Sequence, residues 1–343
     1  MKKNSEYEKI PKTLKQFDLT EKALQELGKL QWVVTEKIHG ANFSFAYENG
    51  RLLFAKRKEY LDWHDDFFGF QEVVSRLEDR VLSLFEQLSL DVPADKFILY
   101  GELFGGQYPH PDVPAHPGIA AIQTGVYYAP GVYFCAFDLA FEAGEKKYYL
   151  DYGTAIRSFE NFGIFYARAL FAGKLNEALD FDLRIPSTIP VLLKLPALDS
   201  NLIEGVVIKP LRHSELKNVE FRPVIKLKNP EFDEDKKFHE AEKWSFIPRI
   251  SSKSEELSFI LAEIAGYINV NRLNSALSKI GRLDLGNPAR LKTIREEMLA
   301  DVWADFNLNH NQLLDDLRAN QQDWLRNRMV ALINGQLNGL QRE

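Results

Sequence analysis

The clearest pattern of apolar and polar positions in this chain is an alternation with a period of two residues, which is typical of half-buried strands. Phe43, Phe45 and Tyr47 alternate with polar or small residues up to Asn49-Gly50, a pair that favours the tight turn of a β-hairpin. Further strands are expected at Val33-Val34, 96–106, 126–128, 132–141, 202–210 and 223–229. Helices are expected at 19–30 and 67–89, a mainly helical stretch at 152–182, and irregular structure at 186–200.

The last third of the chain has the period of helices instead. Helices are predicted at 254–268, 271–281, 289–306 and 311–335, with a loop marked by Gly281, Gly286 and Asn287-Pro288. Residues 231–244 are strongly charged and are typical of a linker. A domain boundary is therefore expected near 235–250.

Composition limits the classes of protein to consider. With 343 residues, the chain is long enough for two domains and a large core. Its net charge of −6 provides no general attraction to nucleic acid, so a local basic face would be needed. Residues 204–229 hold six Lys or Arg against three Glu. No apolar run approaches the roughly 20 residues of a membrane span, and the first residues lack the apolar core of a signal peptide.

The single cysteine, Cys135, excludes an internal disulfide framework and favours a reducing compartment, so a cytoplasmic location is expected. It lies in VYFCAF, where a buried small hydrophobic residue is expected rather than a catalytic thiol. The proline-rich loop contains His110 and His116, but their spacing matches no zinc template, so an ordinary loop is expected.

Four separated segments place ionisable residues on or beside predicted strands. They are Lys37-x-His39-Gly40-x-Asn42, Gly101-Glu102-Leu103, Glu204-Gly205-x-x-x-Lys209 and Lys226-x-Lys228. Residues two apart on a strand share a face. Lys37 and His39 are therefore expected to point the same way, as are the two lysines of the last segment.

The chemistry of these segments depends on whether Lys37 is buried. Burying an ammonium is costly unless it is paired or loses its proton, and burial favours the neutral amine that acts as a nucleophile. From this stretch alone, an exposed lysine on an edge turn stays an alternative. Two carboxylates, Glu102 and Glu204, suggest a metal ion or ribose hydroxyls. Together the segments fit a nucleoside triphosphate with Mg²⁺, although the chain has neither a Walker-type loop nor a GxGxxG turn.

In this order, the segments resemble the motifs of the covalent nucleotidyltransferase superfamily, whose first motif is Lys-x-x-Gly. More closely, TEKIHGANF, YGELFGG, AIQTGVYY, FCAFDLAF, LIEGVVIKP and VIKLKN are similar to the RNA ligase 2 family of ATP-dependent RNA ligases. INVNRLNSALSKIG in the tail is similar to that family's C-terminal domain. The resemblance covers motifs from about residue 32 to 229 and this tail segment, and the stretch 142–200 carries no motif.

The resemblance implies an α+β fold class, in which a nucleotidyltransferase (adenylyltransferase) domain of antiparallel sheets with flanking helices precedes a smaller all-α C-terminal domain. The ligase catalytic domain would span 1–235, a linker 236–250 and a helical RNA-binding domain 251–343. The implied cofactors are ATP and Mg²⁺ or Mn²⁺. The implied partner is RNA with 3′-hydroxyl and 5′-phosphate ends, as a duplex or nicked duplex. We expect a monomer that binds no membrane.

The same resemblance implies a role for each motif residue. Lys37 would attack the α-phosphorus of ATP and form lysyl-AMP. Glu204 would hold the metal ion. Lys226 and Lys228 would bind the α-phosphate, with Lys209 placed for the phosphates. The implied nucleotide-binding residues are Glu36 and Ile38 beside the nucleophile, His39 for the first step, Asn42 for the phosphate or RNA end, Arg57 and Glu102 for the ribose, and Phe137, next to Asp138, for stacking on adenine.

Several alternatives stay open. A capping guanylyltransferase or DNA ligase shares the catalytic motifs, although the helical period of the tail argues against the β-rich OB-fold that usually follows in those relatives. A non-catalytic RNA-binding protein with a ligase fold would be signalled by loss of the lysine or a carboxylate, and both are present. An adenylylating enzyme without sealing activity is a third alternative. Taken alone, Phe137 could be a core residue and Arg57 a solvated edge residue, and Arg272 and Lys279 could contact RNA or solvent.

Overall fold

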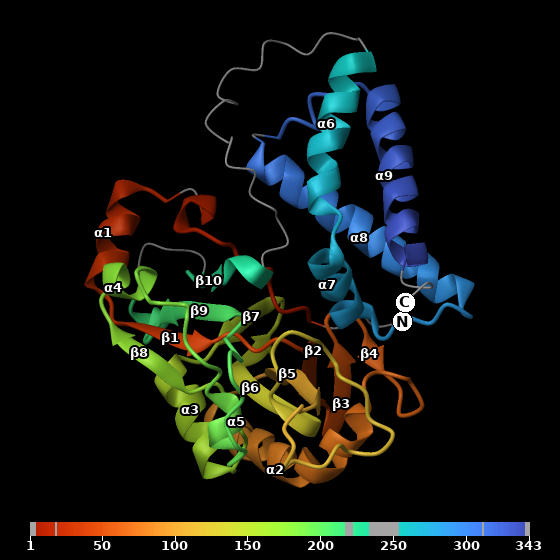
Figure 1. Ribbon diagram of the computed structural model, residues 1–343. Coiled ribbons are helices and arrows are strands. Elements are labelled where there is room, and N and C mark those ends of the chain that lie inside the picture. The colour runs from red at the N-terminus through yellow and green to blue at the C-terminus, as the bar shows by residue number, and fades with distance from the viewer. Residues whose placement is uncertain (1–4, 18, 217–221, 233–253, 311, 340–343) are drawn as a thin grey trace. The chain divides into compact units, whose positions relative to one another are not determined.

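The computed structural model describes residues 5–17, 19–216, 222–232, 254–310 and 312–339 (Figure 1). The chain divides into two compact units, Met1–Glu231 and Phe232–Glu343. Among the described residues, all strands lie in the first unit, and the second is helical. The linker predicted at 236–250 lies outside the described residues.

The larger sheet of the first unit has six antiparallel strands in the order β4-β3-β2-β5-β6-β7. Its strands are β2 (Ala41–Glu48), β3 (Arg51–Lys56), β4 (Tyr60–Leu61), β5 (Lys96–Gln107), β6 (Ala129–Ala143) and β7 (Lys146–Tyr149). The turn between β2 and β3 is formed by Asn49 and Gly50, whose φ angles are +53° and +72°. Asn and Gly tolerate this left-handed backbone, so the predicted hairpin is confirmed.

The smaller sheet has four antiparallel strands in the order β10-β9-β1-β8. Its strands are β1 (Trp32–Glu36), β8 (Ala169–Gly173), β9 (Gly205–Pro210) and β10 (Ile225–Lys228). The helices of the first unit are α1 (Glu21–Lys29), α2 (Phe70–Asp91), α3 (Tyr152–Asn161), α4 (Leu175–Leu179) and α5 (Ile189–Leu192), with 3₁₀ turns at Leu14–Phe17, His213–Glu215 and Pro230–Phe232.

Each sheet buries one face under helices. Phe43 of β2 lies in one apolar core with Phe85 of α2, and Figure 1 shows α2 and α3 against the six-stranded sheet. Trp32 of β1 packs with Leu27 of α1 in a second core, on the four-stranded sheet. Side chains alternate between the faces of a strand, so every second residue of these strands lies on the opposite face.

Those opposite faces meet each other in the first unit. Lys209 of β9 is 3.0 Å, Nζ to Oδ1, from Asp138 of β6, and both side chains are almost fully buried. Polar groups on one sheet therefore reach polar groups on the other. The candidate site lies between these two faces.

The middle of the first unit differs from the sequence-based prediction. The stretch 152–182 was expected to be mainly helical, but α3 ends at Asn161, and β8 then pairs with β1. In β8, Leu170 and Phe171 add to the core under the four-stranded sheet, so burial there outweighs the weak local preference of ALFAG. The strand expected at 126–128 is absent. The next strand, β6, begins at Ala129 and ends at Ala143, so it includes the strand expected at 132–141.

The second unit contains α6 (Ser254–Tyr267), α7 (Val270–Ile280), α8 (Pro288–Asn309) and α9 (Ala319–Gly339), packed around one apolar core. Asn269 and Asn287 cap α7 and α8. Their side-chain oxygens accept the backbone N–H of Arg272 and of Arg290. The helix predicted from 311 begins only at Ala319, because Asn307 accepts the N–H of Leu314 and ties the preceding residues into turns. The α+β class with a following all-α unit is confirmed. Among the described helices, none is both long and apolar enough to span a membrane.

Candidate active site

The turn that carries Lys37 begins where β1 ends. The N–H of Lys37 donates to the carbonyl of Gly205 at 2.9 Å, which fixes the turn to the start of β9. At Gly40, an added Cβ would lie 2.0 Å from the carbonyl oxygen of Leu103, so only glycine allows the turn to lie this close to β5. The turn predicted at Gly40 therefore brings Lys37 against both sheets.

Glu204 is the point where the predicted segments converge. Its side chain is 2% exposed, and Oε2 lies 2.6 Å from Lys37 Nζ and 3.3 Å from His39 Nδ1. Its other oxygen, Oε1, lies 3.2 Å from Lys228 Nζ. Burial would raise the pKa of Glu204, but Lys37, Lys228 and His39 hold this pKa well below its usual range. The group is therefore a carboxylate with basic groups on both oxygens.

Glu102 provides a second carboxyl group with the opposite behaviour. It lies on β5, where its Cα partner on β2 is Asn42, so both residues belong to the face of the sheet that meets the smaller sheet. Burial raises the pKa of Glu102 to about 7, Lys37 opposes this rise, and Glu204 adds to it. Glu204 is thus ionised near neutral pH, whereas Glu102 titrates there. Such a difference in pKa between two neighbouring carboxyl groups is typical of functional sites.

A β-bulge places Phe137 and Asp138 on the same side of β6. Asp138 pairs with Tyr100 of β5, but Ala136 already pairs with Gly101, so Phe137 is an extra residue. Asp138 therefore contacts Lys209 of the other sheet, and Phe137 packs beside Tyr100 rather than in the core under α2. The ring of Phe137 is half-buried and packs edge-to-face with the ring of Tyr7, with 5.0 Å between the ring centres.

Asp138 is the anion of a buried cluster that the sequence-based prediction did not foresee. It accepts hydrogen bonds from Lys209 Nζ at 3.0 Å, from Arg222 Nη1 at 3.0 Å and from the hydroxyl of Tyr7 at 2.5 Å. Burial acts to raise the pKa of Asp138, but Arg222 and Lys209 lower it to about 2. Lys209 also donates to the carbonyl of Phe137, and its side chain is 3% exposed. The ammonium of Lys209 thus binds Asp138 within the chain, and its expected role at the phosphates stays a prediction.

Glu36 and Arg57 also have partners within the chain. The carboxylate of Glu36 accepts hydrogen bonds from the hydroxyls of Ser187 and Thr188 at 2.6 and 2.7 Å, so it holds the segment before α5. The role expected for Glu36 in nucleotide binding stays a prediction. Arg57 Nε lies 2.8 Å from Glu6 Oε1, and both side chains are partly exposed.

The remaining predicted residues fall in or beside the same group. Lys226 and Lys228 alternate on β10 with Ile225 and Leu227, which face the core. The two lysines therefore share the opposite face, which is the site face, as predicted. Ile38 is buried in the turn after Lys37. Cys135 is fully buried, as expected.

Two tail residues have partners within the second unit. Arg272 is 1% exposed and its Nη1 lies 2.6 Å from Asp305 Oδ2, so its side chain is almost completely withdrawn from solvent. Lys279 is paired with Glu297 and Asp301 of α8. His110 lies 3.9 Å from Asp112, and no group of three or more His, Cys, Asp or Glu suited to a metal occurs among the described residues.

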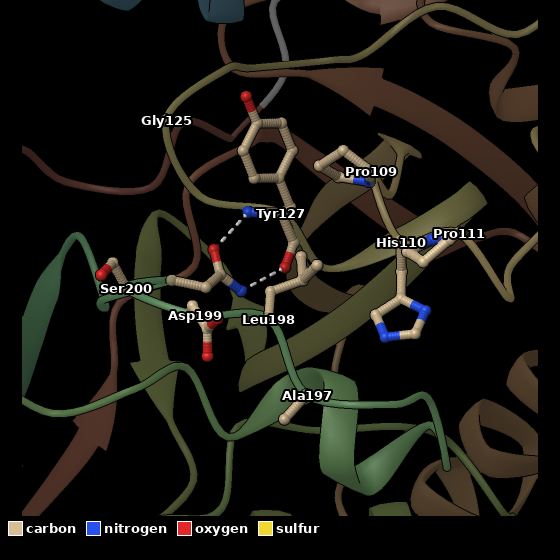
Figure 2. Close-up of a pocket in the computed structure, with 10 residues that line it drawn as sticks. Pro109, His110, Pro111, Gly125, Tyr127, Ala197, Leu198, Asp199 and Ser200 are labelled. Carbon is tan, nitrogen blue, oxygen red and sulfur yellow. Dashed lines mark hydrogen bonds between the residues drawn. The ribbon is translucent and has the colours of Figure 1, made fainter.

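A cavity of about 450 Å³ lies near the site, and Figure 2 shows its lining. Its walls come from Pro109 to Pro111, from Gly125 and Tyr127, and from residues 197–201. Asn201, which also lines the cavity, makes two hydrogen bonds to the backbone of Tyr127, drawn as dashed lines in Figure 2. The next residue, Tyr128, accepts the N–H of His39 at 2.9 Å. Sequence reasoning assigned no role to these residues, although AIQTGVYY was among the matched segments.

Comparisons with known proteins identify the family to which the chain is similar. A model of the RNA ligase family matches residues 30–228, more than half of the chain, and a model of the T4 RNA ligase 2 C-terminal domain matches 251–334. RNA-editing ligase 2 of Trypanosoma brucei brucei, a mitochondrial protein, is 34% identical over 230 residues, which are 60% of this chain and 55% of that protein. RNA-editing ligase 1 of the same organism is 31% identical over 218 residues, 55% of this chain and 46% of that one. The chain thus spans about half the length of these curated relatives.

Solved structures of an RNA ligase from Naegleria gruberi also match. The apo form of one of its lysine-to-alanine mutants has a TM-score of 0.44 at 16% identity, over 66% of this chain and 56% of that one. A second lysine-to-alanine mutant, solved with ATP and Mn, has a TM-score of 0.43 at 15% identity, over the same shares. The match of the family model over residues 30–228 shows that this chain belongs to the RNA ligase family.

Proposed function

We propose that this protein is an ATP-dependent RNA ligase that joins a 3′-hydroxyl to a 5′-phosphate through lysyl-AMP on Lys37 and an AMP-capped RNA. The observation that carries the proposal is the 2.6 Å contact between Lys37 Nζ and the buried Glu204, which His39 and Lys228 share. Membership of the RNA ligase family and the match of the second unit support it.

In the first step, the amine of Lys37 attacks the α-phosphorus of ATP. A P–N bond forms, the P–O bond to pyrophosphate breaks, and pyrophosphate leaves with the electron pair. Negative charge grows on the phosphate oxygens, and Lys226 and Lys228 lie on the face where they would offset it. The half-buried ring of Phe137 is available for stacking on adenine, and Arg57 and Glu102 are proposed to bind the ribose hydroxyls.

The residues present fit a divalent metal ion. Mg²⁺ is commonly bound by one or two carboxylates together with substrate phosphates rather than by a cage of protein ligands. No such cage occurs among the described residues, whereas Glu204 is ionised and Glu102 lies near it. Glu204 would hold the ion, which when bound supplies positive charge to the phosphate oxygens.

The last two steps use the AMP held on Lys37. The 5′-phosphate of RNA attacks lysyl-AMP, which breaks the P–N bond and forms a phosphoanhydride. A 3′-hydroxyl then attacks the capped phosphate and AMP leaves. The second unit is proposed to hold nicked duplex RNA, which proteins read by shape and 2′-hydroxyls. We further propose that the protein acts as a monomer in the cytoplasm.

The proposal is tested with ATP labelled at the α-phosphate and Mg²⁺, followed by a denaturing gel. The parent chain is expected to give a labelled band and Lys37→Ala none. The matched control is Lys22→Ala, on the exposed side of α1, and it should label like the parent. Glu204→Ala and Lys226→Ala are expected to weaken labelling. A band that persists in Lys37→Ala would place the nucleophile elsewhere.

Two further arms separate the related activities. Labelling by GTP instead of ATP would favour a capping guanylyltransferase. Sealing of a nicked DNA duplex but not of nicked RNA would favour a DNA ligase. Labelling without any sealed product would restrict the function to adenylylation. The proposed ligase is expected to label with ATP and to convert nicked RNA into a longer strand.

A further inference from the structure

The turn that carries the nucleophile is held by three of its own backbone N–H groups. The three bonds are from Lys37 N–H to the Gly205 carbonyl at 2.9 Å, from His39 N–H to the Tyr128 hydroxyl oxygen at 2.9 Å, and from Gly40 N–H to the Glu102 carboxylate. Each bond ties the turn to a different segment of the first unit. The acceptor of the second bond, Tyr128, is a side chain that has no role in the proposed chemistry.

We propose that Tyr128 is a positioning residue, whose hydroxyl fixes the turn so that Lys37 and His39 both meet Glu204. The assignment rests on the proposed function, since it concerns the formation of lysyl-AMP. His39 Nδ1 lies 3.3 Å from the same Glu204 oxygen that Lys37 contacts, so a shift of the His39 backbone would move both groups. A misplacement of this kind reduces rate, because attack depends on the alignment of the reacting atoms.

The surroundings of Tyr128 suit this task. Its side chain is 1% exposed, and its ring packs edge-on against Phe104 of β5 with 5.4 Å between centres. Burial, with a further contribution from Glu36, raises the pKa of Tyr128 well above its usual value, so the hydroxyl is neutral whenever the protein is assayed. The ring is held by packing, and the hydroxyl can therefore be removed without moving the ring.

A second contact fixes Tyr128 relative to Glu204. The side-chain oxygen of Asn201 accepts the N–H of Tyr127 at 2.8 Å, and its amide donates to the Tyr127 carbonyl at 2.7 Å (Figure 2). Asn201 is buried and precedes Glu204 by only three residues. The paired bonds act as a clamp between the segment that holds the turn and the segment that supplies the carboxylate.

The experiment compares the full chain with Tyr128→Phe and with Tyr148→Phe, which makes the same change on an exposed ring of β7. Two single-turnover rates are measured. The first is formation of lysyl-AMP from ATP, which needs the Lys37 amine. The second is sealing of a nicked RNA that already carries a 5′-AMP cap, without ATP, which does not need that amine.

Tyr128→Phe is expected to reduce the first rate at saturating ATP by about three- to tenfold, the range for one lost hydrogen bond. The ATP concentration at half-maximal rate and the second rate are expected to stay within about twofold of the parent. Tyr148→Phe should match the parent in both. Asn201→Asp, which turns an oxygen toward the Tyr127 carbonyl in place of a donor, should show the same selective loss.

The outcomes distinguish this assignment from the proposed function. Equal losses in both rates would mean that the hydroxyl supports the fold as a whole, and the assignment would be wrong. The assignment would also be wrong if the parent is active and both Tyr128→Phe and Asn201→Asp form lysyl-AMP as fast as the parent does. A parent chain that forms no lysyl-AMP would overturn the proposed function, and the assignment with it.

Discussion

Replacing Asp138 with Asn would remove the negative charge that two buried cations share. Asp138 is 1% exposed, Lys209 lies 3.0 Å from Oδ1, and Arg222 binds both carboxylate oxygens. The side chains of the two cations are 3% and 13% exposed. An amide has nearly the same shape as the carboxylate, so the perturbation is mainly electrostatic.

Two considerations give the expected loss of stability. Against the effect of burial, Arg222 and Lys209 lower the pKa of Asp138 from 3.8 to about 2. A shift of this size corresponds to about 2 kcal/mol. Removing one partner of a buried ion pair costs about 3 to 5 kcal/mol, because the other charge is left uncompensated. Asp138→Asn is therefore expected to lower the free energy of unfolding of the first unit by about 2 to 5 kcal/mol at pH 7.

The pH dependence has a definite sign. The folded-state pKa of Asp138 lies below the unfolded-state value, so its contribution is fully present above about pH 4 and is lost as pH falls toward 2. The difference between parent and Asp138→Asn should thus be the same at pH 7 and at pH 5.

Differential scanning calorimetry provides the assay. For a unit of this size, each kcal/mol shifts Tm by about 2 to 4 °C, so a decrease of about 4 to 20 °C is expected. The control is Asp112→Asn, whose side chain is 85% exposed and which should leave Tm unchanged. A loss below about 1 kcal/mol, or a difference that changes between pH 7 and pH 5, would refute the reasoning.

Two further predictions concern the nucleophile turn. Gly40→Ala should reduce labelling by ATP at least a hundredfold, because its Cβ would lie 2.0 Å from the backbone of β5, whereas Gly28→Ala, with no atom within 4 Å, should label like the parent. Normal labelling of Gly40→Ala would show that the turn can move away from β5. Because burial raises the pKa of Glu102 to about 7, its carboxylate forms as pH rises through 7, and initial labelling rates of the parent should rise there. In Glu102→Gln this inflection should vanish, and its persistence would assign it to another group.

Local patterns in the sequence were sufficient for much of the fold. The hairpin at Asn49-Gly50, α2 and the helices of the second unit follow from turn chemistry and periodicity over neighbouring residues. β8 was missed because it is a short strand, and it is extended through its pairing with β1, more than a hundred residues earlier, and through the burial of Leu170 and Phe171. A preference that depends on a distant partner has no local signal.

The candidate site shows the same division. The motif residues Lys37, His39, Glu204 and Lys228 were predicted together, and the structure brings them onto one carboxylate. The partner of Lys209 was not predictable from alternation, because spacing gives the face of a side chain and not the group it meets. Arg222 lies in the basic stretch 204–229, but nothing in its neighbours points to Asp138.

The extra residue in β6 has a consequence for how this strand tolerates change. Before Phe137, even-numbered side chains such as Phe134 and Ala136 enter the core under α2, and after it odd-numbered ones such as Leu139 do. Deleting one residue at this point would restore a single parity along the strand. Both halves of β6 would keep their faces and their partners on β5, but only one position between Ala136 and Leu139 would remain on the site side. A relative that aligns here with a one-residue gap cannot present both the ring and the carboxylate on the same side.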